Sequence, residues 1–300
     1  MQNILITGGS GLIGQELSKQ LKALNYGVAH LTRSLKQNAA YKQYRWDIAA
    51  DYIDEKAFEN TDIIIHLAGE NVSNGRWTAQ QKQKILDSRI KSAELISKHL
   101  KDKKLKAFIS ASGISYYGTV TSPQIFNEND PAGTDFLAQV SVKWENAVHA
   151  MSTQAERVAI LRTGVVLSEL GGALKKMVSP IKMGIGSPLG SGNQYLPWIH
   201  INDMVNMYVH AVQNEQFSGT YNAVASQHCT NKEMTEAIAK TLNKKLWAPN
   251  VPAFVLKGLF GEMADIILKG SRIDNTLIKS TGFTFEFDNL EQALKNLLTA

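Results

Sequence analysis

Apolar residues at the start of the chain follow two different periods. The run from Asn3 to Thr7 is short and rich in β-branched residues, which is typical of a strand buried in a parallel sheet. From Gln15 onward, Leu17, Leu21 and Leu24 recur at helical spacing instead. A glycine-rich turn separates the two stretches, so the chain is predicted to begin with a strand–turn–helix unit.

The alternation of apolar strands with amphipathic helices continues to Leu167. Further strands are predicted at Tyr26 to Thr32, Tyr44 to Ile48, Thr61 to Ala68, Lys106 to Ser112 and Arg157 to Leu167. Long helices are predicted at Trp77 to Leu100 and Phe136 to Met151. Strands that alternate with helices in this way predict an α/β fold with a doubly wound parallel sheet.

The pattern changes after Leu167. The stretch from Gly171 to Gly192 is rich in glycine, contains two prolines and is predicted to be a substrate-side loop region. A strand and a helix return between Trp198 and Val212, and a short strand follows at Gly219 to Val224. The tail is predicted to form a smaller α/β lobe from a capped helix at Asn231 to Leu242 and the segments Phe254 to Leu268, Gly282 to Phe287 and Leu290 to Leu298.

The glycines of the first turn carry the chemistry of this part of the chain. Gly8 permits a tight turn, Gly11 lets backbone N–H groups approach a pyrophosphate, and Gly14 lets the helix pack closely on the strand. The N-terminus of the following helix would face the phosphates with unpaired donors and its positive dipole end. A turn that only reverses the chain is the simpler alternative, but the buried strand before it favours a Rossmann-like dinucleotide site.

The end of the second strand indicates which dinucleotide is bound. An Asp or Glu at this place would bind the ribose 2′-hydroxyl of NAD, but Arg33 and Ser34 stand there. The guanidinium fork suits a 2′-phosphate, so we predict NADP(H) as the cofactor. The alternative is an arginine that simply ends the strand in solvent. Asp47, at the end of the third strand, is expected near the adenine.

We therefore predict two domains. An NADP-binding Rossmann domain is expected to span residues 1–167 plus about 198–225, and a smaller substrate-side, C-terminal domain about 168–197 plus 226–300.

Composition and charge exclude several classes of protein. The net charge is +5, but the basic residues are dispersed, which predicts a solvated surface and no nucleic-acid partner. Cys229 is the only cysteine, so neither a disulfide framework nor a thiolate zinc site is expected, and we predict no metal site. No apolar stretch reaches membrane-spanning length and the first strand begins at once, which leads us to expect a cytoplasmic protein without a membrane partner or signal peptide.

A series of ordered motifs resembles a known family. TGGSGLIG, DIIIHLAGENV, RWTAQQKQKILDSRI, FISASGISYYG, KWENAV, ILRTGVVLS and PWIHINDM resemble the atypical extended short-chain dehydrogenase/reductases, and more narrowly the epimerase-family proteins related to nucleoside-diphosphate-sugar epimerases. The tail from Val251 to Leu294 resembles the small C-terminal domain of unknown function of that subgroup. The resemblance covers nearly all 300 residues.

The resemblance implies a set of cofactor-binding positions. They are Gly8, Ser10, Gly11, Leu12, Ile13, Gly14, Thr32, Arg33, Ser34, Asp47, Leu67, Ala68, Gly69, Lys84, Arg89 and Val166. Among them, Lys84 and Arg89 would reach phosphate or ribose, and Val166 would lie near the nicotinamide. His66 is interpreted as a core histidine or one that supports the site.

The catalytic pair of the superfamily is missing. Typical members carry a Tyr and a Lys four residues later on the helix after the fifth strand, where the phenolate moves a proton. Here Leu137 or Gln139 stands in the tyrosine's place, and Gly113 takes the place of the usual hydroxyl partner, preceded by Ser112. The candidates proposed instead are Tyr117, Ser112 and Lys143, ahead of Tyr116, Arg162, His200, Glu70 and Asn71.

Each candidate has a simpler interpretation, and so does the whole chain. Tyr117 can be a packing or positioning residue, Lys143 a solvated helix residue and His200 a core histidine. We predict an NADP(H)-dependent oxidoreductase or epimerase acting on a small polar substrate such as a sugar nucleotide. The alternative is a non-catalytic NADP(H)-binding sensor or partner-binding module. The oligomeric state stays open.

Overall fold

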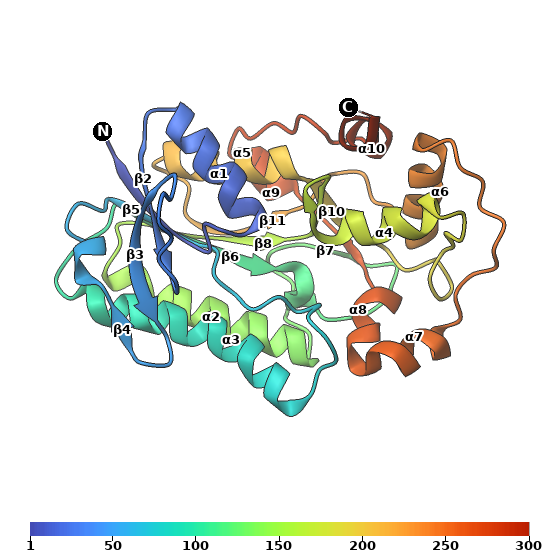
Figure 1. Ribbon diagram of the computed structural model, residues 1–300, viewed down its shortest axis with the longest axis horizontal. Coiled ribbons are helices and arrows are strands. Elements are labelled where there is room, and N and C mark those ends of the chain that lie inside the picture. Colours follow the sequence, from blue (N-terminus) through green and yellow to red (C-terminus); the bar gives the residue numbers. More distant parts are fainter. Residues whose placement is uncertain (300) are drawn as a thin grey trace.

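The protein, described here from a computed structural model of residues 1–299, is built on one eight-stranded sheet (Figure 1). Its strands lie in the order β11-β8-β6-β5-β1-β2-β3-β4. They comprise β1 (Asn3–Thr7), β2 (Gly27–Thr32), β3 (Lys42–Asp47), β4 (Tyr52–Ile53), β5 (Ile63–His66), β6 (Ala107–Gly113), β8 (Val158–Thr163) and β11 (Gly219–Ala223). All neighbours pair in parallel except β3 and β4. The predicted Rossmann-like α/β fold is confirmed.

Helices cover both faces of this sheet. The helices α1 (Leu12–Ala23) and α5 (Ile201–Gln213) lie on one face, and α2 (Ala79–Leu100) and α3 (Phe136–His149) on the other (Figure 1). Because successive strand residues point to opposite faces, Ile4 and Ile6 of β1 join the core under α1, while Leu5 joins the core under α2 and α3.

Side chains at the N-termini of the helices fix where they begin. The Thr78 hydroxyl caps α2 and the Asp135 carboxylate caps α3, each by accepting a backbone N–H of the first turn. Thr230 caps α6 (Asn231–Thr241) in a reciprocal arrangement with Glu233, which confirms the cap predicted there.

The expected single strand from Arg157 to Leu167 is wrong. It divides at Gly164 into β8 and β9 (Val165–Ser168), and β9 pairs with β10 (Trp198–His200) in a separate two-stranded sheet. The Gly164 N–H bonds Ala223 of the main sheet, whereas the Val165 N–H bonds Pro197 beside β10. A Cβ on Gly164 would lie 2.8 Å from the Pro197 oxygen, so a glycine is needed where the chain changes sheets.

The region from Gly171 to Gly192 is also more ordered than expected, because it contains the helix α4 (Gly172–Lys182). Leu174, Val178 and Ile181 are buried at helical spacing along it. Pro180, which suggested a broken segment, lies in the last turn of this helix. The loop expectation holds only for the residues after Lys182.

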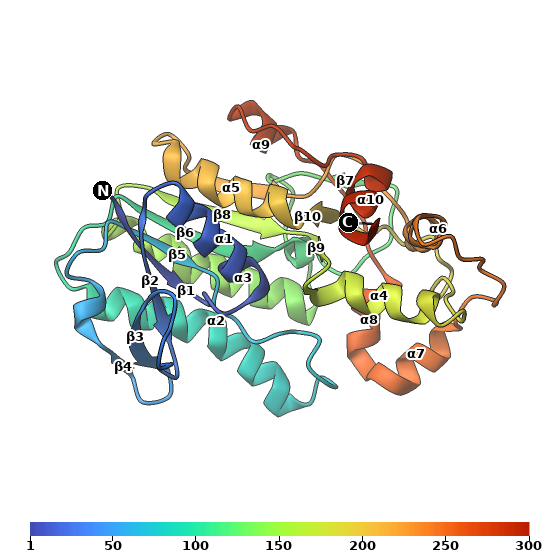
Figure 2. The ribbon, with the colours of Figure 1, turned by 45° about the horizontal axis from the view of Figure 1, so that its top comes forward.

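Most of the C-terminal part lies beyond the carboxyl end of the sheet, whereas its helix α9 (Thr276–Ser280) lies beside α5 and β11 (Figure 2). It also contains α6, α7 (Ala253–Phe260), α8 (Ala264–Leu268) and α10 (Leu290–Thr299), with β12 (Arg272–Ile273) paired to β7 (Ile125–Phe126). Its buried residues, such as Leu294, belong to the same apolar cluster as Ile4 of β1. The two predicted domains thus share one apolar core. The division of the chain into two domains stays a prediction.

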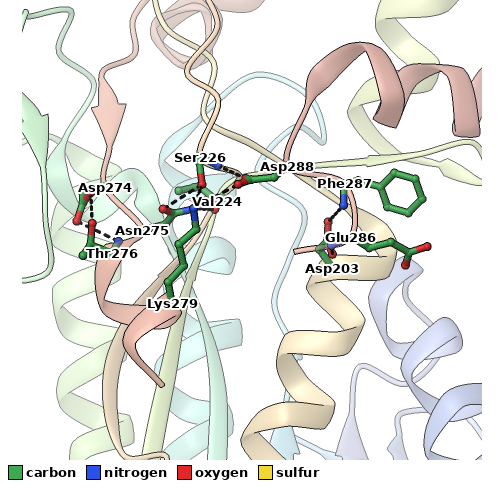
Figure 3. Close-up of polar contacts among 10 residues, drawn as sticks. All are labelled: Asp203, Val224, Ser226, Asp274, Asn275, Thr276, Lys279, Glu286, Phe287 and Asp288. Carbon is green, nitrogen blue, oxygen red and sulfur yellow. Dashed lines mark hydrogen bonds and ion pairs between the residues drawn. The ribbon is translucent and has the colours of Figure 1, made fainter. Parts of the chain in front are cut away.

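Polar contacts tie this tail to the sheet (Figure 3). The Asn275 amide donates to the Val224 oxygen over 2.9 Å, just after β11. Nearby, Lys279 pairs with Asp288 at 3.3 Å. The buried Asp203 carboxylate of α5 accepts the N–H groups of Glu286 and Phe287, so residues 282–287 form no strand and are held by a side chain instead.

Among residues 1–299 no helix combines the length and the apolar character needed to cross a membrane.

Candidate functional site

The glycine turn has the geometry that a dinucleotide requires. Gly8 has φ +70°, and a Cβ there would lie 2.9 Å from the Leu67 carbonyl carbon. A Cβ on Gly14 would lie 2.4 Å from the Gly8 oxygen. Gly11 differs, because it is exposed and a Cβ added to it would meet only the Gly8 oxygen, at 3.2 Å. Gly8 and Gly14 therefore shape the turn, and Gly11 faces open space.

Backbone donors at this turn are free. Gly11 is the N-cap of α1 and supplies no side-chain cap. Within residues 1–299, the N–H groups of Ser10, Leu12 and Ile13 find no acceptor. Unpaired amides and the positive end of the helix dipole converge there, which fits a diphosphate.

The ends of β2 and β3 lie beside this turn. Thr32 ends β2, and its hydroxyl donates to the Ser34 oxygen over 3.1 Å. Arg33 is exposed, and among the described residues its guanidinium has neither an ion pair nor a hydrogen bond. Asp47 ends β3, where one carboxylate oxygen accepts the N–H groups of Ala49 and Ala50. Arg33 is therefore a free donor, whereas Asp47 caps a turn.

A buried hydroxyl positions the segment after β5. The Thr7 hydroxyl accepts the N–H groups of both Leu67 and Ala68 over 3.1 Å. Its own proton must then go to Nδ1 of His66, 2.9 Å away, which places the imidazole proton on Nε2 facing Ser92 at 3.0 Å. His66 is thus a neutral core histidine, as expected, and it supports the loop beside the glycine turn.

Acid should weaken the fold through His66. Burial, with the Arg89 charge adding to it, lowers the pKa of this imidazole from 6.5 to about 4. Between these two values the unfolded chain binds a proton that the folded chain does not, so stability is lost as pH falls from 6.5 towards 4. We expect His66 to contribute about 2 kcal/mol to the stability lost between about pH 7 and about pH 5, so that His66→Gln should lose about that much less than the wild type in urea unfolding. An equal loss in the variant would contradict this assignment.

Two basic residues of α2 have different surroundings. Arg89 donates to the Glu70 oxygen over 3.1 Å and stacks over Trp144, and burial lowers the pKa of its guanidinium to about 10. A Cβ on Gly69 would lie 3.2 Å from the Arg89 guanidinium carbon, so the Arg89 side chain packs against the loop at Gly69. Lys84 is exposed and, among the described residues, makes no polar contact.

Val166 lies on β9, opposite Ile199 of β10. The start of α4 brings this strand to the glycine turn, since a Cβ on Gly172 would lie 3.3 Å from Leu12 and 4.0 Å from the Val166 oxygen. The glycine turn, the loop after β5 and the start of α4 thus meet at the carboxyl end of β1.

Sequence reasoning missed Glu145, the centre of a buried polar cluster. Glu145 forms a bidentate ion pair with Arg162 at 2.9 and 2.8 Å, and the two side chains are 6% and 5% exposed. The Ser112 hydroxyl donates to the same carboxylate over 2.7 Å. The available signal was a lone acid on the apolar face of α3, in the stretch KWENAV.

Tyr117 belongs to this cluster. It is 3% exposed, gives its hydroxyl proton to Asn222 over 2.7 Å and accepts from Arg162 over 3.0 Å. Burial is the main cause that raises the pKa of this phenol to about 12. With its proton held by Asn222, Tyr117 has the geometry of a positioning residue, the alternative considered from the sequence.

Lys143 lies on the solvent face of α3. It is exposed and, within residues 1–299, contacts no polar partner, because it shares the solvent face of α3 with Gln139. The inward face carries Leu137 and Ser141 instead. The exposed position matches the simpler interpretation of Lys143 as a solvated helix residue, and its role as a ribose-holding group stays a prediction.

The remaining candidate residues differ in their surroundings. Among the described residues the Tyr116 hydroxyl has no hydrogen-bond partner, and the Arg162 guanidinium lies 3.3 Å from its ring centroid. His200 is buried against Phe287, and burial lowers its pKa to about 4, so it is a core histidine. Glu70 and Asn71 accept from Asn74 and Ser73 within their own loop.

No group of three or more His, Cys, Asp or Glu side chains in residues 1–299 is arranged to hold a metal ion.

Proteins of known structure share this fold. The human epimerase family protein SDR39U1, crystallised with NADPH, superposes with a TM-score of 0.88 at 29% identity, covering 99% of each chain. A nucleoside-diphosphate sugar epimerase from Corynebacterium glutamicum gives a TM-score of 0.80 at 28% identity, covering 99% of this chain and 58% of the other. MoeE5 in complex with UDP-glucose and NAD, at 18% identity, shares the fold with a TM-score of 0.80 over 99% of this chain and 97% of its own.

Sequence relatives extend over the whole chain. The epimerase family protein Mb2239 of Mycobacterium bovis is 35% identical over 97% of this chain and 96% of its own. The chloroplastic SDR39U1 homologue of Arabidopsis thaliana is 34% identical over 98% of this chain and 86% of its own. Residues 251–297 match the domain of unknown function DUF1731. Residues 4–224 match the NAD dependent epimerase/dehydratase family, and the chain therefore belongs to that family, as the resemblance implied.

Proposed function

We propose that this protein binds NADP(H) in the crevice at the carboxyl ends of β1, β2 and β5. The observation that carries the proposal is the uncapped start of α1, where exposed Gly11 leaves unpaired N–H groups beside the free guanidinium of Arg33. The NADPH of the human relative supports the same conclusion. The amides would hold the diphosphate, and Arg33 with Ser34 would hold the 2′-phosphate.

We further propose that the bound dinucleotide supports an oxidation–reduction or epimerisation. The nicotinamide supplies or accepts a hydride when it is bound. The residues of this chain must then place a small polar substrate and move one proton. UDP-sugar complexes of remote relatives with this fold make a sugar nucleotide a reasonable substrate class.

The source of that proton differs from the usual tyrosine. Leu137 and Ser141 stand on the inward face of α3, and neither can act as a phenolate. Tyr117 donates to Asn222. Among the described residues the hydroxyl of Tyr116, which follows the end of β6, has no hydrogen-bond partner, so we assign the proton transfer to Tyr116 ahead of Tyr117.

A second candidate function is a non-catalytic NADP(H) sensor. The apolar Leu137 on the inward face of α3 favours it, because the group that ordinarily completes the reaction is absent. The two functions separate in one measurement. An enzyme converts a sugar nucleotide into an oxidised, reduced or epimerised product, whereas a sensor leaves the sugar nucleotide unchanged and binds NADP⁺ and NADPH with different affinities.

Arg33→Ala should remove the preference for NADP(H) over NAD(H). A bidentate charge-assisted contact to a phosphate contributes roughly 1.5–3 kcal/mol, so NADP(H) should bind about tenfold to a hundredfold more weakly, with NAD(H) unchanged. Isothermal titration calorimetry with both cofactors measures this. Lys22→Ala, which removes an exposed cation in the last turn of α1, away from the glycine turn, is the control and should bind both cofactors like the wild type. Equal affinities of the wild type for the two cofactors would refute the assignment.

Replacing each tyrosine with phenylalanine should have opposite consequences. Tyr116→Phe removes the free hydroxyl, and we expect turnover to fall about 10²–10⁴-fold with little change in stability. Tyr117→Phe leaves Asn222 and Arg162 each one hydrogen bond short, and should lower the free energy of unfolding by about 1–3 kcal/mol. Steady-state kinetics and urea unfolding test the pair. Unchanged turnover in Tyr116→Phe would remove Tyr116 from the reaction.

A further inference from the structure

Two segments far apart in the sequence lie side by side at one end of the molecule. They are residues 182–190 and 241–260, which we call the lysine-rich tip. The Trp247 indole donates to the Gly184 oxygen over 2.7 Å, the Ser187 hydroxyl to the Pro249 oxygen over 2.6 Å, and the Val251 N–H to the Pro188 oxygen over 2.9 Å. The loop between α6 and α7 marks this extremity in both views (Figures 1 and 2).

The charge of the tip has a single sign. The two segments contain four lysines and no aspartate or glutamate, namely Lys182, Lys244, Lys245 and Lys257. All four lysines are exposed. Glu262, the first acidic residue after the tip, is paired with Lys82 of α2. The tip therefore presents a positive field to anything that approaches it.

The same tip exposes large apolar side chains. Trp247 and Phe254 are 73% and 76% exposed. Five of the thirteen exposed large apolar side chains in residues 1–299 lie in these two segments, the others being Met183, Ile185 and Leu259. Because the indole N–H of Trp247 is bonded to Gly184, its ring is held outward with its polar group already satisfied. Such a concentration of exposed apolar surface marks an interaction site.

We propose that the lysine-rich tip docks on a membrane surface that carries anionic lipids. Exposed tryptophan, phenylalanine and aliphatic side chains enter the boundary between headgroups and acyl chains, while lysines around them are attracted to anionic headgroups. The apolar side chains distinguish this partner from a nucleic acid, whose backbone contacts need cations and hydrogen-bond donors. The contact is peripheral and uses no spanning helix, so the absence of a long apolar segment does not bear on it.

This inference is independent of the proposed cofactor site and goes beyond it. The 300-residue protein should co-sediment with vesicles of phosphatidylcholine and phosphatidylglycerol, and it should not co-sediment with vesicles of pure phosphatidylcholine. Each lysine near an anionic surface contributes about fivefold in affinity, so Lys244→Glu/Lys245→Glu should weaken binding at least about 25-fold. Trp247→Ser should weaken it about tenfold. Added salt should release the wild type.

Matched variants elsewhere on the surface serve as controls. Lys103→Glu/Lys104→Glu reverses another neighbouring pair of lysines, and Leu24→Ser removes another exposed apolar side chain; both should bind like the wild type. The emission of Trp247 should shift to the blue with anionic vesicles and not in Trp247→Phe. Failure of the wild type to sediment, binding that the tip variants keep, or self-association without lipid that Trp247→Ser abolishes would each overturn the proposal.

Discussion

Gly11→Val is expected to abolish NADP(H) binding while the protein stays folded. Gly11 has φ −76°, which any residue adopts, and an added Cβ would meet only the Gly8 oxygen at 3.2 Å. The rest of the valine side chain would enter the space into which the free N–H groups of Leu12 and Ile13 point. Losing two charge-assisted hydrogen bonds to the diphosphate costs about 3 kcal/mol, which is more than ~100-fold in affinity. Calorimetric titration with NADPH measures the loss.

Two other glycines make this test specific. Gly258→Val, on the exposed side of α7 with nothing within 4 Å of an added Cβ, is the control and should bind normally. Gly14→Val should fail differently, by unfolding, because its Cβ would lie 2.4 Å from the Gly8 oxygen. Circular dichroism separates the two kinds of failure. If folded Gly11→Val binds NADPH with wild-type affinity, the glycine turn serves only to reverse the chain.

Glu145→Ala is expected to be among the most destabilising single substitutions in the protein. It leaves the buried Arg162 guanidinium without its carboxylate and the Ser112 hydroxyl without its acceptor. Breaking a buried ion pair from one side costs about 3–5 kcal/mol, since the remaining charge stays out of water. Because the pair also holds the Tyr116–Tyr117 segment through Arg162, cofactor-dependent activity should fall with stability. Urea unfolding at neutral pH gives the free energy.

The magnitude depends on burial, and two further variants test that cause. Glu291→Ala breaks the exposed pair with Lys240 and should cost less than about 1 kcal/mol. Glu145→Leu/Arg162→Met removes both buried charges together and should recover a large part of the loss of the single variant. A double variant as unstable as Glu145→Ala would mean that packing around these side chains, and not the uncompensated charge, sets the cost.

The sequence by itself determined the main sheet and the glycine turn that we propose holds the cofactor. Strands such as Asn3–Thr7 are defined by apolar residues close together in the chain, and the helix spacing after Gly14 is local as well. The role of Gly8 could also be anticipated, because a left-handed turn between strand and helix favours glycine whatever surrounds it. The order of these units then implies a Rossmann-like sheet, because few topologies accommodate alternating strands and helices.

The tertiary structure alone decided which polar side chains meet. Lys143 and Glu145 are two residues apart on α3, yet the rotation of the helix places Lys143 in solvent and Glu145 against Arg162 of β8. The division of the chain at Gly164 depends on Pro197, more than thirty residues later. The Tyr117 hydroxyl donates its proton to Asn222, which is distant in sequence. Side-chain partners of this kind are set by packing between distant segments, and local sequence patterns do not predict them.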